Sequence, residues 1–343
     1  MDEGTATGFG VRGVEDKAVK LSTLLAEGKG VVLDGALATY LETLGADISS
    51  ALWSASLLRT NPSLIQQTHA TYFSHASQIA TTSSYQASLP GLIEHLSITE
   101  SEAVELVRES VLLAQRARDD YLSSTKLHVE HAHGAKDRLL VAGSVGPYGA
   151  YLADGSEYTG SYTLTSSQYQ YFHRGRIAAL VDAGVHVLAI ETIPNFVETR
   201  ALLDLLQTEF PHIEAWFAFT LQPSDATRIA DGTPVADVVA LLQGYDNAVA
   251  VGVNCVAPEL ALAGLREMRK GTGKPLIVYA NSGEKWDAKK RDWKGGKPGG
   301  GELAVWVRDA WDAGARIIGG CCRTGPEDMA NVAQTLGELS RFG

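Results

Sequence analysis

The sequence has few cysteines, no long apolar run and a shortage of cationic residues. Its 343 residues include only 3 cysteines, too few for the disulfide framework of a small secreted domain. No apolar run approaches the roughly 20 residues that a membrane-spanning helix needs. The first residues are polar and rich in glycine, unlike a signal peptide. We therefore expect a cytosolic protein with a frayed tail over residues 1–14.

The shortage of cationic residues bears on possible partners. There are 29 lysines and arginines against 40 aspartates and glutamates, so the formal net charge is −11. A surface of this charge repels phosphate backbones, and nucleic acid is not an expected partner. The content of 45% hydrophobic and 20% charged residues is typical of a globular protein and excludes a disordered or collagen-like chain.

Eight short apolar runs, often β-branched, are the expected strands. Their apolar character is nearly continuous, which is typical of strands that are buried on both faces of a parallel sheet. The runs cover residues 30–34, 78–82, 139–143, 186–190, 215–219, 249–254, 276–280 and 315–320.

Longer amphipathic segments separate these runs and are the expected helices. Pro62 stands at a first helical position behind Asn61, and Thr99 precedes Glu102 by three residues, as in a capping box. Eight strand–helix alternations predict a (β/α)8 TIM barrel, with an open doubly wound sheet as the alternative. No break in composition suggests a linker, so residues 15–343 are expected to form one domain. The helical segments cover residues 62–75, 99–121, 166–183, 197–208, 235–242, 258–269, 302–313 and 326–339.

Two connections are longer than a barrel requires. Residues 123–138 contain His128, His131 and His133, which are mixed with charged residues and favour a solvated surface over a metal site. Residues 281–301 follow the seventh expected strand and contain two tryptophans among glycines and lysines. This extended loop suits either a lid over a ligand or an ordinary surface loop.

All the cysteines follow expected strands. Cys255 follows the strand at 249–254, whereas Cys321 and Cys322 follow the strand at 315–320. In a closed barrel these positions lie on the face where active sites are built. Three thiolates suit zinc and leave one tetrahedral position open, as in a catalytic site. The alternative is three inert core cysteines, but their joint placement favours a metal.

A zinc ion with three thiolate ligands suggests a particular chemistry. The thiolates have already donated charge, so the ion is poorly suited to making hydroxide from water. It is well suited to binding a substrate thiol, which loses its proton when it coordinates the metal. The resulting electron-rich sulfur would attract a cationic alkyl donor such as a sulfonium. This favours alkyl transfer over hydrolysis, and a metal-dependent hydrolase is further disfavoured because no His/Asp cluster follows the strands.

The motifs Gly252–Cys255 and Gly319–Arg323 resemble the signature of the homocysteine S-methyltransferase family. The resemblance extends from about Leu21 to Leu339 and includes residues 33–39, 81–87, 143–149 and 191–194. It implies a (β/α)8 barrel and a zinc ion held by Cys255, Cys321 and Cys322. The segment at 85–87 is more similar to the S-methylmethionine-type branch than to the betaine branch.

The resemblance also implies substrate-binding residues. Asp34 and Glu191 match acids that hold the substrate ammonium, since an unpaired charge in a closed pocket is costly. As an alternative, either acid could cap the next helix. Aromatic faces suit a sulfonium through cation–π attraction. The expected substrate-binding set is Asp34, Tyr85, Gln86, Glu191 and Asn254, with weaker candidates at Trp53, Tyr148 and Ser282.

The predicted function is therefore zinc-dependent methyl transfer from a sulfonium donor to L-homocysteine, which yields L-methionine. The donor is left open between S-methylmethionine, S-adenosylmethionine or both. The partners are small molecules, and a monomer or small homo-oligomer is expected. The alternatives are a selenocysteine or related thiol/selenol methyltransferase, and a non-catalytic zinc- or thiol-binding protein.

Overall fold

The computed structural model describes residues 19–125, 138–287, 292–294 and 299–340. The expected tail at 1–14 and the three histidines of the 123–138 connection lie outside the described residues. Among the described residues, no helix is both long and apolar enough to cross a lipid bilayer.

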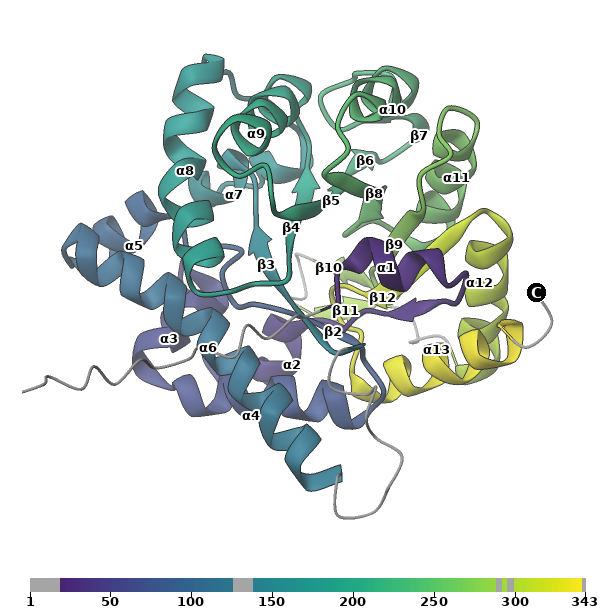
Figure 1. The fold of residues 1–343 in the computed structure, drawn as a ribbon, viewed down its shortest axis with the longest axis horizontal. Coiled ribbons are helices and arrows are strands. Elements are labelled where there is room, and N and C mark those ends of the chain that lie inside the picture. The colour runs from purple at the N-terminus through teal and green to yellow at the C-terminus, as the bar shows by residue number, and fades with distance from the viewer. Residues whose placement is uncertain (1–18, 126–137, 288–291, 295–298, 341–343) are drawn as a thin grey trace, which may run out of the picture.

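Eight parallel strands form one closed ring, with helices packed around it (Figure 1). The strand order is β1-β12-β9-β8-β5-β4-β3-β2. A parallel bridge between Leu33 and Ile79 joins the two end strands. The (β/α)8 barrel is confirmed, and the open-sheet alternative is wrong. Each expected run forms a strand: β1 (Val31–Val32), β2 (Ile79–Thr81), β3 (Leu140–Val145), β4 (Val187–Ile193), β5 (Glu214–Phe219), β8 (Ala248–Asn254), β9 (Leu276–Ala280) and β12 (Ala315–Gly320).

The expected helices also form. The backbone N–H and hydroxyl of Thr99 donate to Glu102, while the Glu102 N–H donates to the Thr99 hydroxyl, which confirms the capping box. The outer helices are α4 (Pro62–Ser74), α6 (Glu100–Thr125), α8 (Ser166–Asp182), α9 (Phe196–Glu209), α10 (Val235–Gln243), α11 (Pro258–Arg269), α12 (Gly300–Asp312) and α13 (Pro326–Leu339).

Several short elements were not expected from the sequence. A helix of one or two turns has little stability alone and depends on tertiary packing, so periodicity does not reveal it. The short helices are α1 (Leu21–Ala26), α2 (Leu37–Thr43), η1 (Trp53–Ser56), α3 (Leu57–Thr60), α5 (Leu89–Leu96), α7 (Tyr148–Leu152) and η3 (Ser156–Tyr158). Two hairpins pair β6 (Leu221–Gln222) with β7 (Asp225–Ile229) and β10 (Lys285–Asp287) with β11 (Asp292–Lys294).

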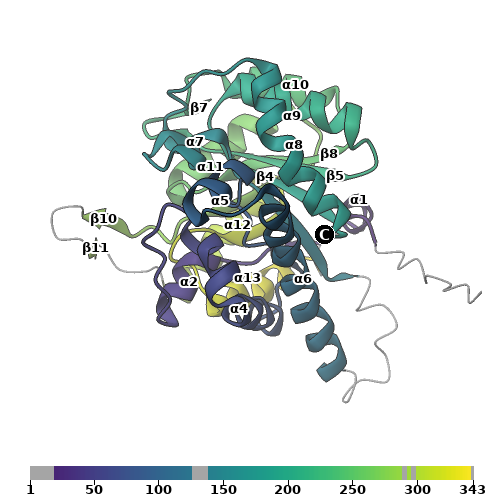
Figure 2. The same ribbon diagram turned by 90° about the vertical axis from the view of Figure 1, so that its left-hand side faces the viewer.

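The two ends of the barrel differ. The first helix, α1, closes one end, where Leu21 and Leu24 are buried against the inward residues of the strands. The backbone N–H and hydroxyl of Ser22 donate to the Glu214 carboxylate and fix this helix in place. The extended loop after the seventh barrel strand carries the β10–β11 hairpin, which projects on the opposite side (Figure 2). The open end of the barrel is therefore the end where the strands finish.

Candidate active site

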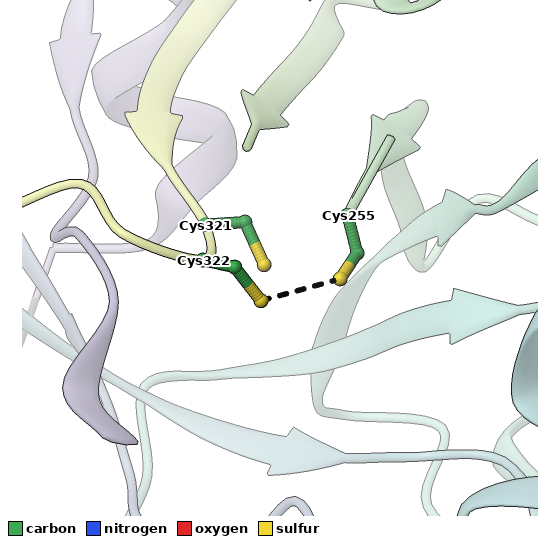
Figure 3. Close-up of side chains that lie close together, drawn as sticks. All are labelled: Cys255, Cys321 and Cys322. Carbon is green, nitrogen blue, oxygen red and sulfur yellow. Dashed lines mark hydrogen bonds between the residues drawn. The ribbon is translucent and has the colours of Figure 1, made fainter. Parts of the chain in front are cut away.

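The three cysteines meet at the open end of the barrel. Cys255 follows β8, and Cys321 and Cys322 follow β12, with their sulfur atoms turned toward one another (Figure 3). The three Sγ atoms lie within 4.8 Å of one another, and the Cys255 and Cys322 sulfurs are 3.8 Å apart. All three thiols are free. The structure thus brings together side chains that are far apart in the sequence.

Two glycines close to the cysteines, Gly252 and Gly320, lie where the structure has no room for a side chain. A Cβ atom at Gly252 would lie 1.7 Å from the Ile277 carbonyl oxygen, and one at Gly320 would lie 2.1 Å from the Thr324 hydroxyl. Cys255 itself has a φ of 56°, a left-handed conformation that is rare outside glycine. Thr192 and Trp53, which line the cavity described below, also have positive φ angles. Such backbone strain is typical of functional sites.

The thiols interact strongly with one another. Hydrogen bonds from Cys255 and Cys321 stabilise a thiolate at Cys322 and lower its pKa. Hydrogen bonding to Cys255 and Cys322 raises the pKa of Cys321, and charge repulsion from these two neighbouring groups raises it further. A cation between the three sulfurs would offset this repulsion. Three soft sulfur donors in a compact group fit a zinc ion.

A cavity of about 630 Å³ surrounds the thiols. It contains every residue of the expected substrate-binding set, together with Trp53. The described lining residues include four carboxylates but no lysine, arginine or histidine. The cavity is therefore suited to cationic ligands. Its lining includes Asp34, Glu42, Asp47, Trp53, Tyr85, Gln86, Tyr158, Glu191, Thr192, Asn254 and Tyr279.

Asp34 and Glu191 are both buried carboxyl groups. The Thr81 N–H and hydroxyl donate to the two Asp34 oxygens at 2.7 and 2.8 Å. The Ser144 hydroxyl donates to Glu191. Burial raises the pKa of Asp34 to about 8 and that of Glu191 to about 7. Since no described cationic side chain lines the cavity with them, a cationic ligand would favour their ionised forms.

Asn254 is the last residue of β8, and its side chain reaches β4, two strands away in the barrel. Its side-chain oxygen accepts from the Thr192 N–H, and its amide donates to the Thr192 hydroxyl, both at 2.8 Å. These bonds stabilise the strained Thr192 backbone beside Cys255. This geometry favours a positioning role for Asn254, while direct substrate contact stays a prediction.

The weaker candidates lie in different places. Trp53 lines the cavity. Tyr148 lies outside the cavity lining and packs against Tyr151, Tyr162 and Phe172. Ser282 also lies outside this lining, although its N–H donates to the Cys322 carbonyl at 3.0 Å.

Tyr158 is a site residue that the sequence analysis missed. Its hydroxyl lies 3.4 Å from the Cys255 sulfur, and it lines the cavity. The two residues are 97 positions apart in the chain, and no local motif marks the short helix η3 that carries Tyr158. Only the closed barrel brings them together.

Comparisons with known proteins agree with this geometry. A family model described as homocysteine S-methyltransferase matches residues 31–336. The homocysteine S-methyltransferase of Escherichia coli is 46% identical over 310 residues, which cover 90% of this chain and 96% of the relative. Selenocysteine Se-methyltransferase of Brassica oleracea is 38% identical over 321 residues, covering 92% of each chain.

A solved structure is similar as well. The metallated form of the E. coli homocysteine methyltransferase MmuM superimposes with a TM-score of 0.80 at 44% identity, covering 91% of this chain and 98% of that one. The relatives are enzymes, and they match almost the whole length of this protein. The chain belongs to the homocysteine S-methyltransferase family.

Proposed function

We propose that this protein transfers a methyl group from a sulfonium donor to L-homocysteine in a zinc-dependent reaction, forming L-methionine. The observation that carries the proposal is the convergence of three thiols beside two buried acids in one cavity. We further propose that residues 15–343 form a single catalytic domain and that the enzyme is cytosolic.

Cys255, Cys321 and Cys322 would hold the zinc ion. When bound, zinc supplies a position for the homocysteine thiol and lowers the pKa of that thiol. A solved structure of the E. coli relative is of a metallated form, which supports a metal in this protein. No separate general base is then needed to remove the thiol proton.

Asp34 and Glu191 would bind the ammonium group of homocysteine. A buried ammonium requires anionic or carbonyl acceptors, and these two acids are the buried carboxyl groups of the cavity lining. Thr81 and Ser144 hold their carboxyl groups in fixed positions. The amino acid would thus be bound at its ammonium while its sulfur points toward the thiols.

The methyl donor would be a sulfonium cation. The cavity offers carboxylates and the aromatic side chains of Trp53, Tyr85 and Tyr158, and aromatic faces attract cations. An anionic donor would meet repulsion. The homocysteine sulfur forms a bond to the methyl carbon while the bond from that carbon to the donor sulfur breaks. The electron pair of the broken bond stays on the donor sulfur, which leaves as a neutral thioether. The contribution of the chain is to align the two sulfurs with the methyl group.

A selenol acceptor is the second candidate, because a selenocysteine methyltransferase matches the same length of chain. Selenocysteine carries the same ammonium group, and its selenium is also a soft nucleophile. A non-catalytic binding protein is disfavoured, since the relatives across the whole chain are enzymes.

A methyl-transfer assay tests the proposal. The purified, zinc-loaded protein is incubated with homocysteine and either S-methylmethionine or S-adenosylmethionine, and methionine is measured by mass spectrometry. We expect methionine with at least one donor, and a loss of turnover after zinc is removed by a chelator and its recovery when zinc is restored. Competition between homocysteine and selenocysteine separates the two acceptors. Zinc-loaded protein that forms methionine with neither donor would refute the proposed function.

A further inference from the structure

Three ionisable residues are buried behind the cavity wall, outside its lining. Arg176 and His173 lie on α8, and Glu198 lies on α9; all three side chains have a relative exposure of 1% or less. Charged groups are rarely buried so fully unless they are paired. We call Arg176, His173 and Glu198 the buried triad.

Hydrogen bonds connect the buried triad in a row. The Arg176 Nη2 lies 3.0 Å from His173 Nδ1, and His173 Nε2 lies 2.7 Å from a Glu198 oxygen. Arginine can only donate, so Nδ1 accepts and the ring proton is on Nε2, which donates to Glu198. Burial lowers the pKa of His173. A neutral imidazole therefore bridges a buried cation and a buried anion.

The arginine end of the buried triad holds the segment that carries Tyr85. Arg176 donates to the Tyr85 carbonyl at 2.9 Å and to the Gly146 carbonyl at 2.6 Å. Gly146 in turn packs against the Tyr85 ring, because a Cβ atom there would lie 2.8 Å from it. The guanidinium thus fixes the loop after β2 to the loop after β3 while Tyr85 faces the cavity.

The glutamate end holds the segment that carries Tyr158. The Tyr148 N–H and the Tyr162 hydroxyl each donate to Glu198 at 2.6 Å. Together with the bond at Gly146, these contacts restrain residues 146–162 near both ends. Tyr158 lies within this segment, with its hydroxyl next to the Cys255 sulfur.

We propose that the buried triad is a positioning device that fixes Tyr85 and Tyr158 at the cavity and thereby sets the affinity for the cationic methyl donor. The triad makes no hydrogen bond to the thiols or to Asp34 and Glu191 in the contacts described above. The Arg176 charge does act on Glu191, because it lowers the pKa of that carboxyl group. Arg176→Lys keeps this charge, so its effect should fall on Tyr85 and Tyr158, whose ring faces can bind a cation. For its kinetic readout this inference rests on the proposed function.

A charge-free double variant tests the inference. Arg176→Met with Glu198→Met removes both buried charges, so neither is left unpaired. The matched control is Arg174→Met with Glu209→Met, because this ion pair joins the same two helices at an exposed site with N–O distances near 2.8 Å. Arg176→Lys, which keeps the charge but not the fork of donors, is the conservative variant.

We expect the double variant to raise the KM for the donor about tenfold or more, since small displacements of binding groups are costly. Zinc content should stay at the wild-type level, and the homocysteine KM should change much less. Hydrogen exchange measured by mass spectrometry should become faster in peptides covering residues 82–87 and 146–162. Arg176→Lys should give smaller changes in the same direction, and the control variant should resemble the wild type.

Two results would overturn the inference. One is a folded double variant with the donor KM and exchange rates of the control. The other is an equal loss of zinc, homocysteine binding and donor binding, which would indicate general structural support. Arg176→Lys provides the same measurements if the double variant does not fold. If the wild-type enzyme forms no methionine, the proposed function fails, and the exchange rates at 146–162 alone decide the role of the buried triad.

Discussion

Asp34 and Glu191 are acids held where a negative charge is costly. Burial raises the pKa of Asp34 to about 8 and that of Glu191 to about 7, so both retain protons to a substantial degree in the ligand-free protein at neutral pH. An ammonium ligand favours the ionised acids and is therefore bound with release of protons. It follows that affinity for an amino acid should depend on pH, with tighter binding as the acids ionise.

L-Methionine can test this dependence because it has the ammonium group of homocysteine but no thiol proton. We expect its inhibition constant against homocysteine to fall as the pH rises from about 6 to about 8, through the raised pKa values of both acids. Asp34→Asn should flatten the profile and raise the homocysteine KM while zinc content is unchanged. An identical profile in Asp34→Asn would rule out the ammonium role of Asp34.

The cysteines give a second prediction for single residues. Cys255→Ser, Cys321→Ser and Cys322→Ser should each lose zinc and turnover together, because a hydroxyl is a poor substitute for a soft thiolate ligand. Zinc is measured by atomic emission on the purified variants. Ser83→Ala is a suitable control, since its hydroxyl lies in the same cavity lining without a hydrogen-bond partner among the described residues. A variant of any one cysteine that keeps stoichiometric zinc would remove that residue from the ligand set.

The ends of the strands determine where the site residues point. The register of β4 against β5 shifts between Ile190 and Ile193, and such a bulge re-aims the side chains within it. Glu191 and Thr192 lie in this interval, and Asn254 at the end of β8 stabilises it. Asn254 on β8 thus stabilises the irregular end of β4, although β5 lies between these two strands in the barrel.

Asn254→Ala should therefore destabilise the fold. It removes both bonds to Thr192 and leaves a buried N–H without its acceptor, which costs about 2 kcal/mol. Urea unfolding followed by circular dichroism measures the loss. Gln207→Ala, at an exposed position of α9, should change the free energy of unfolding by no more than about 0.5 kcal/mol. Equal stabilities of the two variants would contradict this role of Asn254.

The first helix, α1, supplies a contrast because it closes the other end of the barrel. Leu21→Ala removes a fully buried side chain and should cost about 2–5 kcal/mol of unfolding free energy. The homocysteine KM should stay the same, since the cavity lies at the opposite end. Leu44→Ala, at a residue with 39% exposure, is the control. A raised homocysteine KM in folded Leu21→Ala would show that the two ends are coupled.

The sequence predicts some of these elements better than others. The barrel strands and outer helices follow from local patterns, because a buried strand or an amphipathic helix has its own periodicity. The cysteines could be placed since the end of a strand is itself a local feature. The roles of Tyr158 and the buried triad could not be predicted. In the sequence, Arg176 looks like an ordinary arginine within a helix, and Glu198 looks like an ordinary acid in a first helical turn. Their roles arise only from contacts between elements distant in the chain.

At the scale of the whole molecule, the net charge and the charged side chains of the cavity lining are both negative. The net charge is −11, and the described cavity lining contains carboxylates and thiols without a cationic side chain. Such a field raises the local concentration of cations and is screened by salt. A cationic donor should therefore be affected by ionic strength more than a neutral zwitterion.

Kinetics at increasing sodium chloride concentration can test this field. Between about 20 and about 200 mM salt, kcat/KM for S-methylmethionine, which carries a net positive charge, should fall several-fold. The value for homocysteine, whose net charge is near zero, should change much less. Circular dichroism at each salt concentration checks that the fold is unchanged. Parallel salt dependences for both substrates would contradict electrostatic attraction of the donor.

The seam between β1 and β2 has a consequence for redesign. β1 is only two residues long and reaches β2 through the Leu33–Ile79 bridge. Asp34 directly follows Leu33, and its carboxylate accepts two hydrogen bonds from Thr81, the last residue of β2. Asp34, which we propose to bind the ligand, therefore also connects β1 to β2 where the ring closes. A variant that replaces Asp34 to accept a different amino acid will also lose these hydrogen bonds, and it will need a new contact between β1 and β2.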